Sequence, residues 1–114
     1  EGLIKPPYHY GFVMNVPAAI PYSVPNLQAM IDALPEGADF TVMGIGRSCV
    51  PAQFGAIATG GWIRVGFEDN VFYSKGVLAK SNAELVGRAS RIAHEAGLAP
   101  ATPDEVRAYL KLRG

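Results

Sequence analysis

The sequence predicts an α/β fold built on a parallel sheet. Three short β-rich runs alternate with segments of helical periodicity, and they start roughly 25 residues apart, which is typical of repeated βα units. None of the three runs has a regularly polar face, so we expect both faces of the sheet to be covered. The three runs are residues 11–16, 39–46 and 62–66.

The length of the chain limits how much of a larger fold it can form. Its 114 residues suffice for one small domain. A closed (β/α)8 barrel needs about 250 residues, so the chain corresponds to about three-eighths of one. Because three parallel strands alone leave two unpaired edges, we expect one of two arrangements. Either the other barrel units come from another chain or an unobserved segment, or the sheet is open and self-associates.

The first βα unit joins the run 11–16 to a helix that starts after Ser23. Residues 1–10 contain a Pro-Pro pair and are predicted to be a loop that leads into the strand. Ser23 suits the N-cap position, and apolar residues then recur at the spacing of one helix face. Pro35 and Gly37 are expected to end this helix. The apolar face consists of Leu27, Met30, Ile31 and Leu34.

The second unit joins the run 39–46 to a helix whose apolar residues include Val50, Phe54 and Ile57. The segment Gly46, Arg47 and Ser48 lies between the strand and the helix. Such a junction can place backbone N–H groups and a guanidinium near an anion. A tight turn with a solvated arginine explains the same residues, and the pattern matches neither GxGxxG nor a P-loop.

The third unit starts with the run 62–66 and continues through an irregular piece at 71–78. Ser81 followed by Glu84 is a capping box that opens the longest helix, and Gly97 is suited to end it. A second capping box opens a short terminal helix. This box is Thr102-Pro103-Asp104-Glu105, and the helix carries Val106, Tyr109 and Leu110.

Polar side chains are concentrated where the third strand ends. Alternation along a strand would place Arg64, Gly66 and Glu68 on one face, with Asp69 and Asn70 just beyond the strand. A structural ion pair needs one acid and one base, so the second carboxylate is in excess. Excess charge near a buried strand is costly unless something binds it. We therefore interpret this cluster as a site rather than a salt bridge at the rim.

The other candidate residues also follow strands. Asn15 comes after the first run, and residues 44–48 end and follow the second. In a (β/α)8 barrel the chemistry gathers at the carboxyl ends of the strands. The sequence therefore predicts that these groups meet the cluster at 64–70 along one edge of the sheet.

Composition excludes several classes of function. Ten Lys and Arg balance ten Asp and Glu, so no global field favours nucleic acid or an acidic membrane surface. The apolar runs are far shorter than the ~20 residues that a membrane span needs, and no secretory signal pattern is present. The single cysteine, Cys49, fits a reducing, cytoplasmic setting. Because the chain begins at Glu1 without an initiator Met, we expect a processed, truncated or partly observed polypeptide.

Several motifs carry a resemblance to a known family. Residues 60–70 read GGWIRVGFEDN, residues 73–89 read YSKGVLAKSNAELVGRA, and residues 101–107 read ATPDEVR. Together they resemble the β-keto acid cleavage enzymes. The resemblance covers nearly the whole chain but only the C-terminal third or so of a family member. It implies that residues 1–114 form the C-terminal part of a TIM barrel, roughly strands six to eight with their helices and a terminal helix.

The resemblance also implies an activity and roles for individual residues. Family members exchange a β-keto acid with acetyl-CoA to give acetoacetate and a new acyl-CoA. Glu68 resembles the family's glutamate ligand for a divalent metal, usually zinc. Asp69 resembles the group that removes the substrate's acidic proton, and Arg64 resembles the partner that positions that aspartate and holds it ionised. Such roles suit the chemistry, since a β-keto acid has an acidic α-C–H bond.

Part of the family's machinery has no counterpart in these residues. The two histidine ligands of an early His-x-His motif are absent from the 114 residues. We therefore expect a homo-oligomer or a complementing N-terminal segment. Gly46, Arg47, Ser48, Asn70 and Asn15 are the predicted substrate- or CoA-binding residues. Two alternatives stay open: a non-catalytic half-barrel that associates through its sheet edges, and a CoA- or phosphate-binding module based on residues 46–48.

Overall fold

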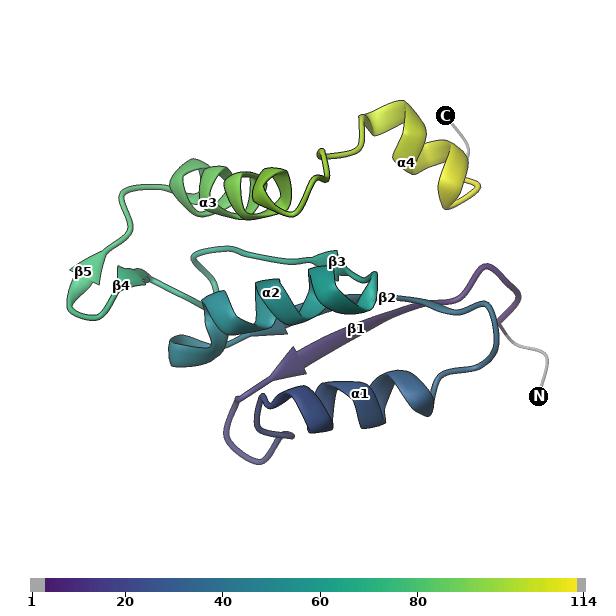
Figure 1. The fold of residues 1–114 in the computed structure, drawn as a ribbon, viewed down its shortest axis with the longest axis horizontal. Coiled ribbons are helices and arrows are strands. Elements are labelled where there is room, and N and C mark those ends of the chain that lie inside the picture. The colour runs from purple at the N-terminus through teal and green to yellow at the C-terminus, as the bar shows by residue number, and fades with distance from the viewer. Residues whose placement is uncertain (1–3, 113–114) are drawn as a thin grey trace.

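The computed structural model describes residues 4–112, so the first three residues of the predicted leading loop lie outside the described residues. Helices and strands alternate through most of the chain, as Figure 1 shows. The elements are β1 (His9–Met14), α1 (Val24–Asp32), β2 (Asp39–Gly44), the 3-10 helix η1 (Gly46–Ser48), α2 (Cys49–Thr59), β3 (Trp62–Ile63), β4 (Phe72–Ser74), β5 (Val77–Leu78), α3 (Asn82–Glu95) and α4 (Pro103–Tyr109).

The main sheet has three parallel strands in the order β1-β2-β3. β1 and β2 pair along their whole length, from His9 beside Asp39 to Met14 beside Gly44. β3 pairs with β2 over only two positions, and the N–H of Arg64 then donates to the carbonyl of Val42 at 3.1 Å. The predicted α/β class with a parallel sheet is confirmed.

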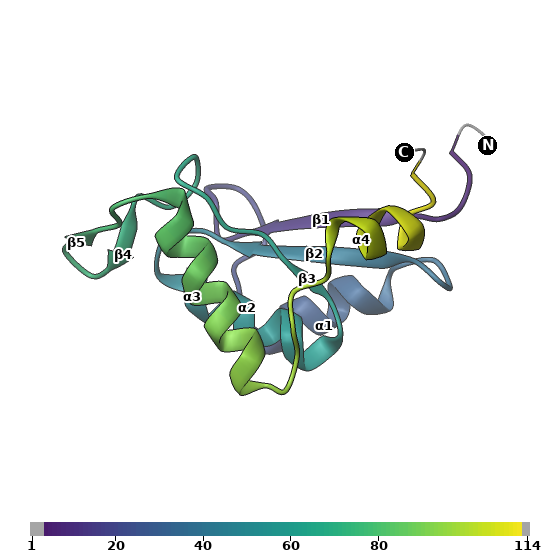
Figure 2. The same cartoon turned by 90° about the horizontal axis from the view of Figure 1, so that it is seen from above.

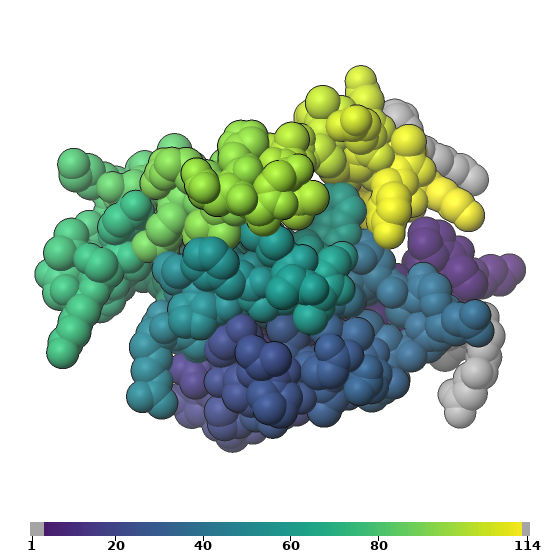
Figure 3. Space-filling view, viewed as in Figure 1, coloured from purple at the N-terminus to yellow at the C-terminus, as the bar shows by residue number. Residues whose placement is uncertain are grey.

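Helices α1 and α2 cover one face of this sheet (Figure 2). The core between the layers joins Phe12 and Met14 of β1 to Leu27 of α1 and to Ala52 and Ala56 of α2, all nearly inaccessible to solvent. Figure 3 shows α1, α2 and α3 as adjacent bands across one side of the molecule. Small alanines on α2 let that helix approach the strands closely, which fixes where the loops at its start lie.

The expectation that both faces of the sheet are covered holds only in part for the described residues, because Met43 of β2 is buried whereas its neighbour on the same face, Val13 of β1, is not. Burial alternates along the end of β1, where Phe12 and Met14 are buried and Val13 between them is 38% exposed. Alternate side chains of a strand point to opposite faces, so the face that carries Val13 lacks a covering layer in this region. In a closed barrel this face would line the interior.

All three predicted strands differ from the structure at their ends. The first is residues 9–14 rather than 11–16, because Asn15 adopts a left-handed backbone with φ of 71° and turns the chain. The second stops at Gly44, before the 3-10 turn. The third is reduced to Trp62–Ile63, because the chain leaves β2 after Arg64.

The prediction of an irregular piece at 71–78 is wrong, since these residues form a β-hairpin. β4 and β5 pair antiparallel, with Phe72 beside Leu78 and Ser74 beside Val77. Gly76 in the turn has φ of +76°, a conformation that favours glycine. Three of the strand residues, Phe72, Val77 and Leu78, are more than half exposed.

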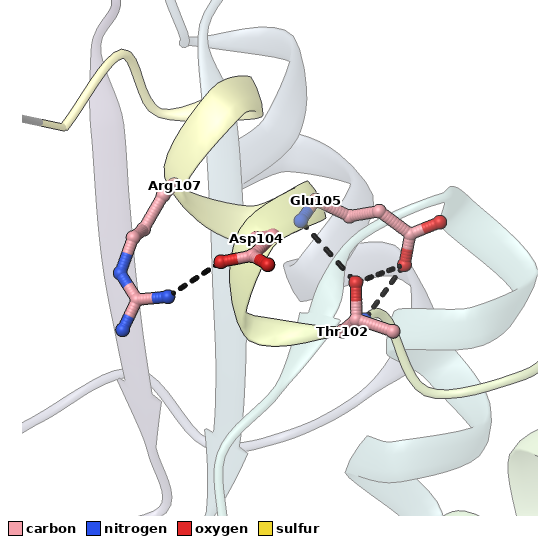
Figure 4. Close-up of polar contacts among 4 residues, drawn as sticks. All are labelled: Thr102, Asp104, Glu105 and Arg107. Atoms are coloured by element: carbon pink, nitrogen blue, oxygen red, sulfur yellow. Dashed lines mark hydrogen bonds and ion pairs between the residues drawn. The ribbon is translucent and has the colours of Figure 1, made fainter. Parts of the chain in front are cut away.

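The capping residues of the two predicted capping boxes are confirmed, although only one box is complete. The Ser81 hydroxyl accepts the Glu84 N–H at 3.1 Å, but the Glu84 carboxylate accepts from the N–H of Lys80 rather than of Ser81. At α4 both halves form: the Thr102 hydroxyl accepts the Glu105 N–H, and the Glu105 carboxylate accepts the Thr102 N–H at 2.7 Å (Figure 4). The Thr102 hydroxyl also donates to the Glu105 carboxylate at 2.9 Å. The bonds that the carboxylate accepts from the backbone N–H and the hydroxyl of Thr102 lower the pKa of Glu105.

Candidate functional site

Two asparagines bind the loops at the carboxyl ends of the strands together. Asn70 is 5% exposed; its amide oxygen accepts the Gly46 N–H at 2.6 Å, and its amide nitrogen donates to the Gly44 carbonyl at 2.9 Å. Asn15 donates to the Ile45 carbonyl at 3.1 Å from the other side. The segment 44–46 is therefore held between the ends of its two neighbouring strands. The predicted convergence of the three strand ends is present, and both asparagine amides act within the chain.

Gly44 is the tightest point of this edge. A Cβ atom at that position would collide with the Ser48 carbonyl oxygen and lie 2.7 Å from the Cβ of Ala52. The close approach lets η1 and the start of α2 fold directly over the end of β2. Only glycine can occupy this position without moving the backbone.

The polar cluster after β3 is assembled around one guanidinium. Nη2 of Arg64 lies 3.9 Å from Oε2 of Glu68 and 3.9 Å from Oδ2 of Asp69. The side chains differ in exposure: 85% for Glu68, 55% for Arg64 and 23% for Asp69. The arrangement brings the three predicted residues together as loose ion pairs, longer than direct hydrogen bonds.

The strand alternation predicted for Arg64, Gly66 and Glu68 is wrong, because the chain after Arg64 is not a strand. Residues 67–69 form a turn in which the N–H of Asn70 donates to the Gly66 carbonyl at 3.1 Å. The amide oxygen of Asn82, at the start of α3, accepts the N–H of Phe67 at 2.8 Å. A turn, rather than alternation along a strand, therefore brings both carboxylates toward Arg64.

Of the two interpretations that the sequence left open for the junction 46–48, an anion site and a tight turn, the structure has the tight turn. The N–H of Gly46 is bonded to Asn70, and the N–H and hydroxyl of Ser48 both donate to the Ile45 carbonyl. Ser48 is also buried. Two backbone N–H groups of the junction are therefore engaged within the chain, whereas the Arg47 side chain is exposed and can reach an anion.

A cavity of about 1040 Å³ adjoins the cluster. It lies between the junction after β2, the turn after β3 and the β4–β5 hairpin. Its lining includes Asp69 and Asn70 together with three cationic side chains, Arg47, Lys75 and Arg88. Sequence reasoning missed Lys75 and Arg88 as site residues because it did not recognise the hairpin; the turn glycine Gly76 between two apolar pairs was the available signal.

The described residues do not form a metal centre by themselves. Within residues 4–112, no group of three or more His, Cys, Asp or Glu side chains is placed to hold an ion. Glu68 is mostly exposed, and its nearest ionic neighbour is the cation Arg64. One carboxylate beside a guanidinium does not match the multidentate sites that zinc occupies.

The opposite end of the sheet carries a second polar group that sequence reasoning also missed. His9 lies with Nδ1 3.3 Å from Oδ2 of Asp39 and Nε2 2.6 Å from the Thr41 hydroxyl. Trp62 donates its indole N–H to the same Asp39 oxygen at 2.5 Å, and its ring contacts Tyr109 of α4 with centroids 5.7 Å apart. The parallel register, which places His9 beside Asp39, was needed to find it.

A parallel α/β sheet with polar groups at the carboxyl ends of its strands is the layout of an α/β enzyme. The sequence pattern of the beta-keto acid cleavage enzymes matches residues 1–112. The chain belongs to the beta-keto acid cleavage enzyme family.

Characterised relatives give the same assignment. The chain is 47% identical over 113 residues to a 3-keto-5-aminohexanoate cleavage enzyme of Fusobacterium nucleatum, covering 99% of this chain and 41% of the relative. It is 46% identical to the enzyme of that name from Acetoanaerobium sticklandii, covering 96% of this chain and 40% of the relative. A 3-dehydrocarnitine:acetyl-CoA trimethylamine transferase of Rhizobium meliloti is 37% identical, with 98% and 37% covered. The chain thus spans about two-fifths of the length of these relatives.

Among the described residues, no helix combines the length and apolar character required to cross a bilayer.

Proposed function

We propose that this chain is the C-terminal part of a (β/α)8 barrel that exchanges a β-keto acid with acetyl-CoA. The parallel order β1-β2-β3 and the helices on one face suit strands six to eight of such a barrel. The exposed face that carries Val13 corresponds to the barrel interior. Relatives are named as cleavage enzymes of a β-keto acid or as acetyl-CoA transferases. In this exchange the acyl group of the β-keto acid moves to CoA, and the acetyl group of acetyl-CoA leaves in acetoacetate.

Asp69 is the proposed general base, and the position of Arg64 is the observation that carries the proposal. Asp69 is the less exposed carboxylate, with Arg64 3.9 Å away and the large cavity beside it. A carboxylate facing a cavity can take the α-C–H proton of a β-keto acid bound there. The guanidinium of Arg64, 3.9 Å away, is the proposed partner that positions Asp69 for this role.

Glu68 is the residue that we assign toward a divalent metal, with zinc as the ion expected from the resemblance. When bound, such an ion supplies electrophilic stabilisation of a keto oxygen. Because the described residues alone do not fit the metal, we assign no step of the reaction to it. The complete ligand set would require residues from a complementing segment or another chain.

The remaining predicted residues are proposed to shape and bind the acyl-CoA side of the site. Arg47 is the exposed cation available for a direct contact. Asn15, Gly46, Ser48 and Asn70 are proposed to act through the rigid loop that their hydrogen bonds create. The single cysteine, Cys49, is buried, and a reducing, cytoplasmic setting remains part of the proposal.

A chimaera tests this function: the chain replaces its matching segment in the Fusobacterium nucleatum relative. We expect the chimaera to cleave 3-keto-5-aminohexanoate only when acetyl-CoA is present, with acetoacetate as a product. The substitution Asp69→Asn removes the base and retains its shape. A folded chimaera with no acetyl-CoA-dependent exchange, or an Asp69→Asn variant with full turnover, would contradict the proposal.

A non-catalytic half-barrel is the second candidate, favoured by the uncovered sheet face and the exposed side of β1. Association through these surfaces would bury them without any catalysis. Light scattering of the purified chain measures this directly. A stable homo-oligomer that binds no acetyl-CoA favours the half-barrel, whereas a monomer that restores exchange on addition of the relative's remaining segment favours the enzyme.

A further inference from the structure

The cavity beside Asp69 carries more positive charge than the proposed proton transfer requires. Three cationic side chains line it, Arg47, Lys75 and Arg88, against the single carboxylate of Asp69. The rest of the lining is largely apolar or aromatic, including Val50, Val71 and Phe72. Its volume of about 1040 Å³ is at the upper end of the range of ligand pockets. Such a lining suits a long ligand that is apolar over part of its length and anionic elsewhere.

Each cation comes from a different structural element. Arg47 belongs to η1, Lys75 to the turn between β4 and β5, and Arg88 to α3. β4 separates Lys75 from the turn that holds Asp69. A ligand that extends along β4 would therefore place one end near the candidate base and the other near Lys75.

Arg88 is held in the wall of the cavity. Its guanidinium donates to the carbonyl of Tyr73 and lies 4.4 Å from the centre of the Tyr73 ring. Its Nη2 also lies 3.9 Å from the sulfur of Cys49. The buried Nε atom has no hydrogen-bond partner among the described residues. Arg88 thus anchors the hairpin to α3 while leaving one buried N–H group unsatisfied, which a bound ligand or water can relieve.

We propose that this cavity binds the phosphorylated nucleotide end of the CoA thioester, with Lys75 as a phosphate-binding residue and Arg88 as the residue that positions the hairpin. The proposal rests on the proposed function, which makes a CoA thioester the ligand. In (β/α)8 barrels, phosphate groups frequently bind at the loops after strands seven and eight, the places that β2 and β3 would hold. Lysine and arginine are the side chains that bind phosphate as charge-assisted donors.

The kinetic test compares two thioester donors in the chimaera: acetyl-CoA and acetyl-pantetheine, which lacks every phosphate of the nucleotide. We expect Lys75→Ala to raise KM for acetyl-CoA about tenfold, as for the loss of one hydrogen bond to a charged group. Its effect on kcat/KM for acetyl-pantetheine should be much smaller. The matched control is Lys80→Ala, which removes an exposed lysine outside the cavity lining and should leave both donors unaffected. Equal effects of Lys75→Ala on both donors, or none on either, would overturn the proposal.

A binding measurement on the chimaera, in which the chain is joined to the relative's remaining segment, separates this proposal from the catalytic one. Calorimetric titration with adenosine 3′,5′-bisphosphate should give saturable binding that Lys75→Ala weakens about tenfold, whereas adenosine alone should bind far more weakly. Full-strength binding by Lys75→Ala, or no preference for the bisphosphate over adenosine, would place the phosphates elsewhere. Because no turnover is measured, this result stands even if the chimaera proves inactive; conversely, an active chimaera with unchanged Lys75→Ala binding rejects only the phosphate site.

Discussion

The two ends of the parallel sheet use polar residues in different ways. At the amino end, Asp39 accepts hydrogen bonds or ion-pair contacts from Trp62 and His9 at 2.5 and 3.3 Å, and its side chain is only 15% exposed. At the carboxyl end, Glu68 and Asp69 each lie 3.9 Å from Arg64, in a more open setting. The amino end has its polar groups satisfied within the chain, whereas the carboxyl end leaves charges free to contact a ligand.

In (β/α)8 barrels, residues at the amino end of the strands contribute to stability, and residues at the carboxyl end form the active site. The difference between the two ends of this sheet agrees with that pattern. The backbone of the carboxyl end is nevertheless rigid, because Asn15 and Asn70 hold the segment 44–46 from both sides. Ordered loops with loosely paired charges are what a preorganised site requires. The comparison therefore predicts that charge substitutions reduce stability at the amino end, and that backbone substitutions do so at the carboxyl end.

The largest loss of stability is expected for Gly44→Ala. The added methyl group would collide with the Ser48 carbonyl and force η1 away from β2. We expect a loss of about 3 kcal/mol in the free energy of unfolding, measured by urea denaturation. Gly11→Ala is the matched control, since a Cβ there would meet no atom within 4 Å. Similar losses in the free energy of unfolding for Gly44→Ala and Gly11→Ala would show that the close packing around Gly44 is not what makes this position sensitive.

The next effect is expected for Asp39→Asn at the amino end. The carboxylate accepts through both oxygens, with Trp62 and His9 at Oδ2 and the N–H of Phe40 at Oδ1. An amide has a single accepting oxygen, so at least one of these contacts is lost. We expect a loss of about 2 kcal/mol in the free energy of unfolding. Asp104→Asn serves as the control: that side chain is 96% exposed and pairs with the exposed Arg107, so a change below about 0.5 kcal/mol is expected. If Asp104→Asn lost as much stability as Asp39→Asn, the difference in exposure between the two carboxylates would not explain the cost of Asp39→Asn.

A smaller effect is expected at α4, whose Tyr109 packs on Trp62 at this same end. Thr102→Ala removes the cap and should reduce the free energy of unfolding by about 1 kcal/mol. The backbone N–H of residue 102, the larger cause of the lowered pKa of Glu105, is retained, but the bond from the hydroxyl to the Glu105 carboxylate, the smaller cause, is removed. A lowered folded-state pKa contributes stability above the unfolded pKa, and this contribution is lost as pH falls through the folded value. The free energy of unfolding should therefore depend less steeply on pH in the acid range for Thr102→Ala than for the unchanged chain. An equal pH dependence would argue against the bond between the Thr102 hydroxyl and the Glu105 carboxylate in solution.

The smallest effect on stability is expected for Glu68→Gln. The side chain is 85% exposed and lies 3.9 Å from Arg64, so its ion pair is screened by solvent. We expect a change within about 0.5 kcal/mol in the free energy of unfolding. A loss comparable to that of Asp39→Asn would mean that the carboxyl end also depends on its charges, and the comparison would fail.

The elements with strong local signals could be predicted from the sequence. Ser23, Ser81 and Thr102 were each expected to cap a helix, and their hydroxyl groups do accept the predicted N–H bonds. Apolar spacing likewise gave helices that follow parallel strands. These features depend on residues within one or two turns of each other, so no tertiary information was needed.

The features that the sequence did not predict depend on how the strands pair in three dimensions. The third strand ends early because the chain leaves β2 after Arg64, and no local residue signals that departure. The hairpin 72–78 depends on pairing of two very short strands, and the His9–Asp39 contact depends on register between β1 and β2. For the candidate site, motif similarity indicated Arg64, Glu68 and Asp69, but the turn that gathers them and the cavity with Lys75 and Arg88 emerged only in three dimensions.

The central claim is that Asp69 performs chemistry while Asp39 maintains the fold. It is tested most directly by the turnover number of Asp69→Asn beside that of Asp39→Asn, both in the chimaera at saturating acetyl-CoA and at a temperature where both are folded. We predict that Asp69→Asn loses about 10²- to 10⁴-fold in kcat, as for removal of a general base, whereas folded Asp39→Asn retains nearly full kcat. Comparable kcat values for the two variants would contradict the account.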